Sequence, residues 1–152
     1  MPSPTALPTG DPQDQVSLEG AADPAIGRAF LTAYASHNWD ALRALMHQDI
    51  TWDLPGVGPI SGRAHGVDAV IARVRKIVDG GTQTELLHLL VGRLGIALSL
   101  HNTGQRPDGR VLDEYLTTLL RFEGGTIAAI ETYLSDVDMM EIYFRDGNAT
   151  NV

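Results

Sequence analysis

The sequence predicts an α+β fold, with helices gathered on one face of a curved antiparallel sheet. Apolar residues recur at helical spacing up to about residue 79, and from residue 83 onward they recur with a period of two. Gly-containing turn signals separate the later segments. A chain of 152 residues suits one domain with a sizeable core. Helices followed by a meander of strands are typical of α+β architecture.

Three helices are predicted in the first half of the chain. Asp23 followed by Pro24 is a typical helix start, since aspartate caps the free N–H groups and proline suits the first helical position. Asn38 is the expected cap of a short second helix that buries Trp39. A third amphipathic helix is expected over residues 66–79, ended by two glycines.

The strands are predicted from shorter patterns. "DITWDLP" is typical of a short strand closed by Pro55, and "GVGPISGRAHG" of a loop with a brief extended piece. "SDVDMMEIYF" predicts a short closing helix or turn, with Asp136 as its cap. The four strands of the meander are expected near residues 83–92, 95–103, 110–122 and 126–134.

Composition limits the partners. Eleven basic and 19 acidic residues give a net charge of −8, which argues against nucleic acid or a membrane surface. Cysteine is absent, and the histidines lack metal-site spacing, so no metal site is expected. The N-terminus has no secretory pattern, and a cytoplasmic location is expected. Residues 1–22 are expected to be a disordered tail, 23–145 the domain and 146–152 a loose end.

The strand "ALSLHNTG" places leucines and a histidine on opposite faces. Leu98 and Leu100 share one face, whereas Ser99 and His101 share the other. The later strands have apolar residues on both faces, and such sheets are usually covered on both sides. Helices can cover only one face, so the other is expected to meet a second subunit. We therefore expect the leucines at an interface and His101 in a cavity.

Two longer segments resemble a known superfamily. "YASHNWDALRALMHQDITWDLPGVGPISG" and "LLRFEGGTIAAIETYLSDV" are similar to the nuclear transport factor 2-like superfamily, which includes ketosteroid isomerase, limonene epoxide hydrolase and the SnoaL-like polyketide cyclases. The likeness covers about residues 24 to 144. It implies a cone-shaped, cystatin-like α+β barrel, with its sheet wrapped around three N-terminal helices. It also implies an apolar pocket and a homodimer formed through the convex sheet face.

The catalytic residues of two members of the superfamily do not carry over. The positions that match the isomerase tyrosine, strand aspartic acid and loop aspartate are Phe30, Thr118 and Leu54. No Arg-x-Asp pair matches the epoxide hydrolases, and their final-strand aspartate is replaced by Thr132. Those two mechanisms are therefore disfavoured.

A histidine-centred site is predicted instead. His101 is the expected acid–base group, because imidazole titrates near neutral pH. Glu114 or Asp113 would orient it, and Tyr34 or Ser99 would bind a developing oxyanion. Asp53 lies one residue from the isomerase base position and is a further candidate, although a turn-capping role fits it as well. The expected substrate-binding positions, besides Ser99, are Phe30, Trp52, Leu54, Leu116, Thr118 and Thr132.

The predicted function is cofactor-free acid–base catalysis on a small apolar, oxygenated molecule. The resemblance implies a polyketide- or terpenoid-like substrate that is cyclised or isomerised. A non-catalytic dimeric module that binds a ligand or a protein is the alternative, and epoxide opening by other carboxylates is a further one. Cavity size discriminates, since a catalytic member needs about 300 Å³ or more.

Overall fold

The computed structural model describes residues 20–146, which form one six-stranded sheet and four helices. The predicted tails therefore lie outside the described residues, apart from their innermost positions. The elements in chain order are α2 (Pro24–Ala35), α3 (Trp39–Ala44), β1 (Met46–Leu54), β2 (Gly62–His65), α4 (Val67–Asp79), β3 (Gln83–Val91), β4 (Gly95–Gln105), β5 (Val111–Glu123), β6 (Thr126–Leu134) and α5 (Val137–Phe144).

The strands are ordered β2-β1-β6-β5-β4-β3. The β3–β6 meander is antiparallel throughout, as predicted. One pairing differs from the rest of the sheet, since β1 pairs with β6 in parallel, with Trp52 opposite Ile130. The long connection through α4 and the meander makes this pairing possible. The brief extended piece of the loop becomes β2, an edge strand antiparallel to β1.

The helix boundaries follow from the capping residues. The carboxylate of Asp23 accepts a hydrogen bond from the N–H of Ala25 at 2.9 Å, and Pro24 is the first helical residue. The side chain of Asn38 accepts from the N–H of Ala41 at 3.1 Å. The side chain of Asp136 accepts from Met139 N–H at 2.9 Å, which confirms a closing helix capped by Asp136.

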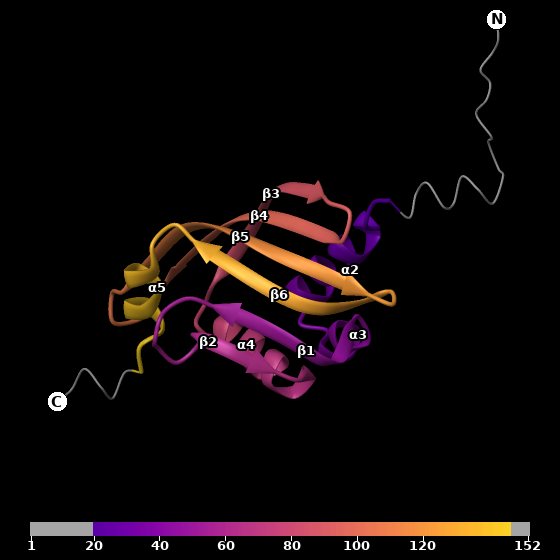
Figure 1. Ribbon diagram of the computed structural model, residues 1–152. Coiled ribbons are helices and arrows are strands. Elements are labelled where there is room, and N and C mark those ends of the chain that lie inside the picture. Colours follow the sequence, from indigo (N-terminus) through magenta and orange to yellow (C-terminus); the bar gives the residue numbers. More distant parts are fainter. Residues whose placement is uncertain (1–19, 147–152) are drawn as a thin grey trace, which may run out of the picture.

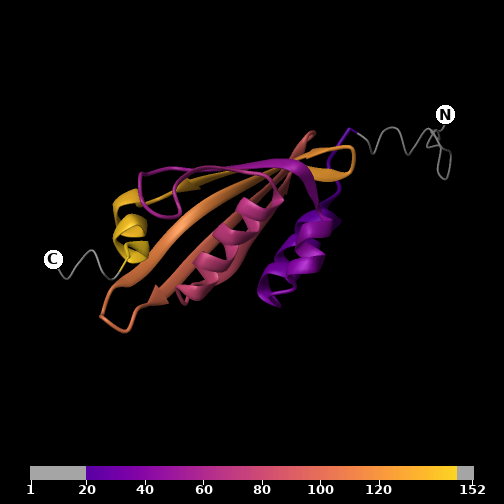
Figure 2. The same cartoon turned by 90° about the horizontal axis from the view of Figure 1, so that it is seen from below.

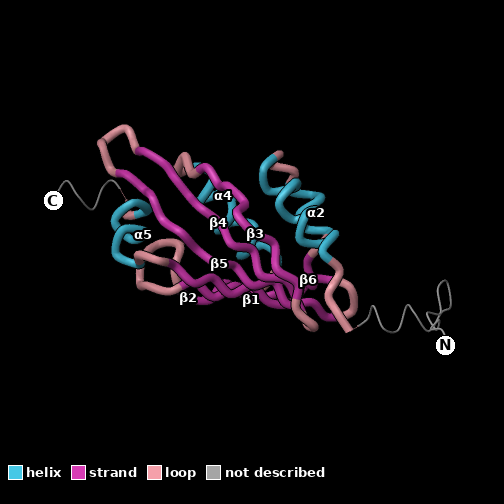
Figure 3. Tube along the Cα trace, turned by 90° about the horizontal axis from the view of Figure 1, so that it is seen from above, coloured by secondary structure: helices cyan, strands magenta, loops and turns pink. Residues whose placement is uncertain are grey.

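The helices lie on one side of a curved, unclosed sheet (Figure 1). Figure 2 shows α4 and α2 side by side beneath the strands, with α5 at one end of β5 and β6. Seen from the opposite side, the strands lie in front of α4 (Figure 3). The core lies between the sheet and the helices, and includes fully buried residues such as Leu42, Ile50, Val70, Leu98, Ile127 and Tyr143.

The two faces of β4 are the reverse of those predicted. Leu98 and Leu100 are buried at 0% and 6% exposure and face the helices. Ala97, Ser99 and His101 are half-buried and face the opposite, convex side. Leu98 and Leu100 occupy the inner face because burying two leucine side chains removes far more apolar surface from water than burying Ser99 and His101 would.

Candidate functional site

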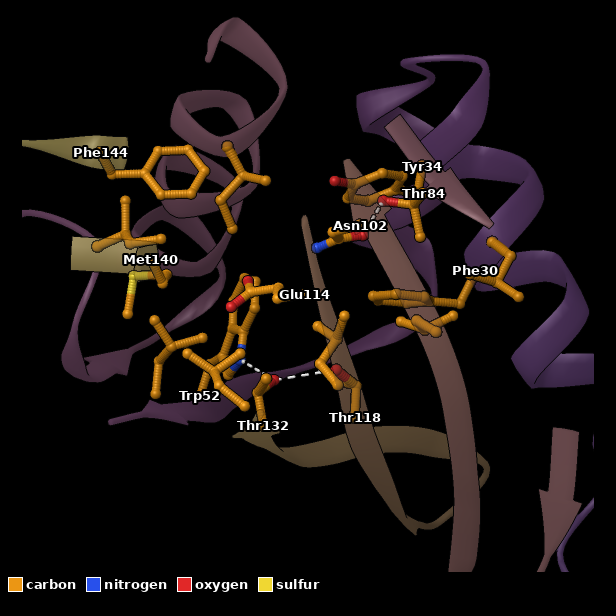
Figure 4. A pocket seen from close by; sticks show the side chains of 17 residues that line it. Phe30, Tyr34, Trp52, Thr84, Asn102, Glu114, Thr118, Thr132, Met140 and Phe144 are labelled. Atoms are coloured by element: carbon orange, nitrogen blue, oxygen red, sulfur yellow. Dashed lines mark hydrogen bonds between the residues drawn. The ribbon is translucent and has the colours of Figure 1, made fainter. Parts of the chain in front are cut away.

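An apolar pocket lies between the helices and the concave face of the sheet (Figure 4). Its volume is about 60 Å³, which is below the roughly 300 Å³ or more of most small-molecule sites. Helices α2, α4 and α5 contribute one side, and strands β1, β3, β4, β5 and β6 the other. The lining residues are Phe30, Leu31, Tyr34, Trp52, Leu54, Ile60, Ile77, Thr84, Leu100, Asn102, Glu114, Leu116, Thr118, Thr132, Leu134, Met140 and Phe144.

Glu114 is the only acidic residue among the described residues that line this pocket. It is 2% exposed, and its Oε2 atom has no hydrogen-bond partner within residues 20–146. Burial raises the pKa of Glu114 from 4.5 to about 7, and the negative charge of Asp136 adds to the effect. A carboxyl group with such a pKa is present in both protonation states near neutral pH.

A chain of hydrogen bonds fixes the floor of the pocket. The indole Nε1 of Trp52 donates to the hydroxyl of Thr132 at 3.0 Å, and the hydroxyls of Thr132 and Thr118 lie 3.0 Å apart (Figure 4). All three residues are buried. The register of β5 and β6 places Thr118 opposite Thr132, so the two hydroxyls meet on the concave face. These hydrogen bonds give the buried indole N–H of Trp52 an acceptor and fix its ring as one wall of the pocket.

Tyr34, Thr84 and Asn102 form a polar group at the far side of the pocket (Figure 4). The hydroxyl of Thr84 donates to Oδ1 of Asn102 at 2.7 Å, which leaves the amide nitrogen of Asn102 directed toward the cavity. Burial raises the pKa of the Tyr34 phenol, and contact with the hydroxyl of Thr84 partly offsets this. Tyr34 therefore stays protonated at neutral pH, as a hydrogen-bond donor requires.

The loop between β1 and β2 is anchored at the pocket mouth by α5 and α4. The carboxylate of Glu141 accepts hydrogen bonds from the N–H of Val57 and, at 2.6 Å, from the N–H of Gly58. The guanidinium of Arg73 donates to the carbonyl oxygens of Trp52 and Ser61 at 2.9 and 3.1 Å. These contacts hold the loop that carries Ile60 into the pocket.

His101 lies outside the pocket, and its predicted place in the cavity is wrong. It is directly opposite Tyr115 in the β4–β5 register, and the two rings stack with centroids 4.3 Å apart on the convex face. Its Nε2 is 2.6 Å from the carboxylate of Asp113, which lies on the same face. Asp113 does pair with the histidine, as expected of one of the two acids, but Ser99 shares this outer face too. None of the three reaches the cavity, because their neighbours on each strand occupy the inner face.

Asp53 also points away from the pocket. Its carboxylate accepts two hydrogen bonds from the guanidinium of Arg63, at 2.7 and 2.8 Å, across the β1–β2 pair. The same partner lowers the pKa of Asp53. The pair is solvent-exposed and unconnected to the cavity, so neither a proton-transfer role nor a turn-capping role fits this aspartate.

The other predicted positions line the cavity, and their chemical roles stay predictions. These residues are Phe30, Tyr34, Trp52, Leu54, Glu114, Leu116, Thr118 and Thr132. Sequence reasoning missed Asn102, Met140 and Phe144. The alternation of side chains along β4 could have predicted Asn102, because it shares a face with Leu98 and Leu100, which point inward. Met140 and Phe144 depend on where α5 folds back, which no local pattern indicates.

Residues 20–146 contain neither a membrane-spanning helix nor a cluster of metal ligands. No helix there is long and apolar enough to cross a lipid bilayer. No group of three or more His, Cys, Asp or Glu side chains there is arranged to hold a metal ion.

Comparison with known proteins identifies the family. Residues 27–130 match the SnoaL-like domain, and the chain belongs to this family, within the nuclear transport factor 2-like superfamily. No protein with a curated description matches the chain.

Solved structures share the fold at low identity. Bal32a, from a soil-derived mobile gene cassette, is 23% identical over 80% of this chain and 95% of its own, with a TM-score of 0.74. A nuclear transport factor 2-like protein from Burkholderia xenovorans is 17% identical over 80% and 94%, with a TM-score of 0.69. A candidate ketosteroid isomerase from Kribbella flavida is 18% identical over 74% and 77%, with a TM-score of 0.63. These likenesses support the curved α+β fold.

Proposed function

We propose that the pocket catalyses proton transfer on a small apolar molecule that carries an oxygen atom, as in an isomerisation or a cyclisation. One observation carries this proposal: a single carboxyl group, that of Glu114, is buried in an apolar cavity with a pKa of about 7. Family membership extends the proposal to polyketide- or terpenoid-like substrates. The reaction needs only the movement of protons, so no cofactor enters it.

The proposed acid–base group is Glu114, instead of His101, which was predicted from the sequence. An acid–base catalyst works best when its pKa lies near the operating pH, because it can then both accept and return a proton. Glutamate reaches this range when burial disfavours its charged form. The unpartnered Oε2 of Glu114 leaves one oxygen available to a substrate proton.

Tyr34 and Asn102 are the proposed donors to the substrate oxygen. Proton removal beside a carbonyl places negative charge on that oxygen, and neutral donors stabilise it in a dry cavity. The phenol of Tyr34 stays protonated, and the amide nitrogen of Asn102 is not used by its bond to Thr84. Apolar walls such as Phe30 and Leu116 exclude water from the reaction.

Deuterium exchange into a model ketone tests this function without knowledge of the natural substrate. Cyclopentanone, a small ketone of one ring with exchangeable protons beside its carbonyl, is incubated with the protein in heavy water and followed by NMR. We expect the wild-type protein to accelerate exchange and Glu114→Gln to lower the rate by about 100-fold or more. Glu123→Gln, at the exposed end of β5, is the matched control and should leave the rate unchanged. Equal rates for the wild type and Glu114→Gln would refute the assignment.

A non-catalytic module that binds a ligand or a protein is the second candidate. The cavity volume of about 60 Å³ is below the roughly 300 Å³ or more that small-molecule sites usually occupy, which favours the protein-binding form of this candidate. Binding of the ketone without any acceleration of exchange, in the wild type and in Glu114→Gln alike, would support this candidate over the enzyme.

We also propose that the convex sheet face meets a second copy of this chain. Tyr115 and Tyr133 are each 55% exposed on that face. Tyrosine is enriched at protein–protein interfaces, so two exposed tyrosines on one face favour an interface there. The stacked pair of His101 and Tyr115 gives the face a rigid aromatic centre. Analytical ultracentrifugation of the wild type and Tyr115→Arg tests this. A dimer that the substitution converts to a monomer is expected, and a wild-type monomer at high concentration would contradict the proposal.

A further inference from the structure

A groove rich in basic side chains lies at one end of the molecule, outside the Glu114 pocket. It is built by the last two turns of α4, the hairpin between β4 and β5, and the C-terminal end of α5. Figure 2 shows α5 and this hairpin at the same end of the sheet. The groove has a volume of about 500 Å³, within the roughly 300–1,000 Å³ of small-molecule sites. Its lining residues are Ala72, Arg75, Lys76, Asp79, Gly80, Arg106, Arg110, Phe144, Arg145 and Asp146.

Positive charge is concentrated in this groove. Five of the 11 basic side chains of the chain line it, against two of the 19 acidic ones. The chain as a whole has a net charge of −8, so the groove is a local exception on an acidic molecule. Arginine and lysine side chains gathered around a concave surface raise the local concentration of anions.

Two of the five basic side chains also stabilise the fold. Arg110 pairs with Asp108 at 2.8 Å, and its guanidinium donates hydrogen bonds to three carbonyl oxygens at the end of α5. The Nε of Arg106 donates to the carbonyl oxygen of Tyr143 at 3.1 Å. These bonds cap the C-terminal end of α5, which is a common position for basic side chains. Capping therefore accounts for Arg110 and for one nitrogen of Arg106.

The guanidinium of Arg106 is held in place across the groove. It lies 5.0 Å from the centre of the Tyr143 ring, and a Cβ atom at Gly80 would be 3.4 Å from its Nη2 atom. The hairpin side chain thus reaches the end of α4. Its hydrogen bond uses Nε alone, so its two terminal nitrogens have no partner within residues 20–146. A planar donor group that is already fixed loses little freedom when it binds an anion.

The other three basic side chains are exposed and unpaired in the part of the chain that the structure describes. Arg75, Lys76 and Arg145 take part in none of its ion pairs, although Asp79 and Asp146 line the same groove. Like charges that face one space without an anion between them repel each other. An anion bound in the groove would relieve this repulsion.

We propose that this groove binds a small molecule with two linked phosphate groups. A phosphate group offers several acceptor oxygens, so it can bond to several donors at once. Arg106 binds one phosphate through its two terminal nitrogens, and Arg75 and Lys76 of α4 bind the other. This site is separate from the proposed proton-transfer chemistry, since Phe144 is the only residue that lines both the groove and the Glu114 pocket.

The distribution of charge favours a small anion over an acidic macromolecule. At physiological salt, surface charges act over about 8 Å, so a ligand inside the groove meets mainly the local positive charge. A nucleic acid or an acidic protein would extend beyond the groove. It would then meet the rest of the chain, which holds all but two of the acidic side chains.

Titration calorimetry with pyrophosphate, ADP and citrate in about 50 mM salt tests the proposal. We expect pyrophosphate and ADP to bind, and citrate, which has only carboxylates, to bind about tenfold more weakly. Tighter binding of ADP than of pyrophosphate would support a nucleotide as the source of the phosphates, and equal binding would support recognition of the diphosphate group alone. Arg106→Gln should weaken both phosphate compounds about tenfold, as expected for a lost bond to a charged group.

Two exposed side chains provide a second variant and its matched control. Lys76→Gln removes no ion pair within residues 20–146 and should weaken both phosphate compounds about threefold. Arg93→Gln, in the turn at the opposite end of β4, should bind them like the wild type. Absence of binding by both phosphate compounds, citrate that binds as tightly, or equal affinities in Lys76→Gln and Arg93→Gln would overturn the site. Glu114→Gln should bind both compounds like the wild type, so either proposal can fail without the other.

Discussion

Asn102 lies directly opposite Glu114 in the register between β4 and β5, and both side chains are buried in the same pocket. The adjacent pair in the register, His101 and Tyr115, lies on the opposite face of the sheet. One residue along each strand therefore separates an enclosed carboxyl group from an exposed aromatic pair. This relationship decides which titratable group can meet a ligand in the cavity.

Glu114→Gln should change the dependence of stability on pH. The folded-state pKa of about 7 is above the ordinary 4.5, so the folded protein keeps this proton while the unfolded chain releases it. The free energy of unfolding of the wild type should therefore fall between about pH 4.5 and pH 7, by on the order of 3 kcal/mol from this group. Urea unfolding at pH 5 and pH 8 should show that Glu114→Gln loses less stability than the wild type. The same loss in both proteins would contradict a buried, neutral Glu114.

His101→Gln should leave proton exchange into cyclopentanone within about twofold of the wild type, because the imidazole is on the far side of the sheet from the cavity. The same holds for Asp113→Asn. NMR rates measured beside those of Glu114→Gln provide the comparison. A large loss of exchange rate in a folded His101→Gln protein would contradict the conclusion that His101 lies outside the active site.

Thr132→Val should destabilise the protein by about 1–3 kcal/mol, because it leaves the buried indole N–H of Trp52 without an acceptor. Thr117→Val, on the convex face of β5, is the matched control and should cost clearly less. Urea unfolding measures both. Equal costs for the two substitutions would mean that the hydrogen-bond chain contributes nothing specific.

Glu141→Gln should loosen the loop between β1 and β2. The carboxylate accepts bonds from two successive backbone N–H groups, and bonds to a charged acceptor contribute about 1.5–3 kcal/mol. Hydrogen exchange of the Val57 and Gly58 amides should therefore speed up, by roughly tenfold. Asp138→Asn, an exposed acid on the same helix, is the control. Unchanged exchange in Glu141→Gln would show that other contacts hold the loop.

Local signals in the sequence predict the elements well because each acts over a few residues. Asp23, Asn38 and Asp136 each cap a helix through a bond to an N–H two or three residues away. The period of two places the β-strands of the meander. The parallel pairing of β1 with β6 joins residues far apart in the sequence, such as Trp52 and Ile130, and no local pattern encodes it.

The candidate site was predicted in part for a similar reason. Alternation alone places Glu114, Leu116 and Thr118 on one face, and all three line the pocket. It does not state which face of β4 is inside. The prediction that His101 lies in the cavity assigned the wrong face of β4 to the inside. The burial of Leu98 and Leu100 determines which face of this strand is inside.

The most direct test is an NMR titration of the Glu114 carboxyl carbon in the folded protein, with Glu114→Gln used to assign the signal. The account predicts a midpoint of about 7, set by burial in the apolar pocket. A midpoint near the ordinary 4.5 would mean that water reaches this carboxyl freely, and the proton-transfer site would then be refuted.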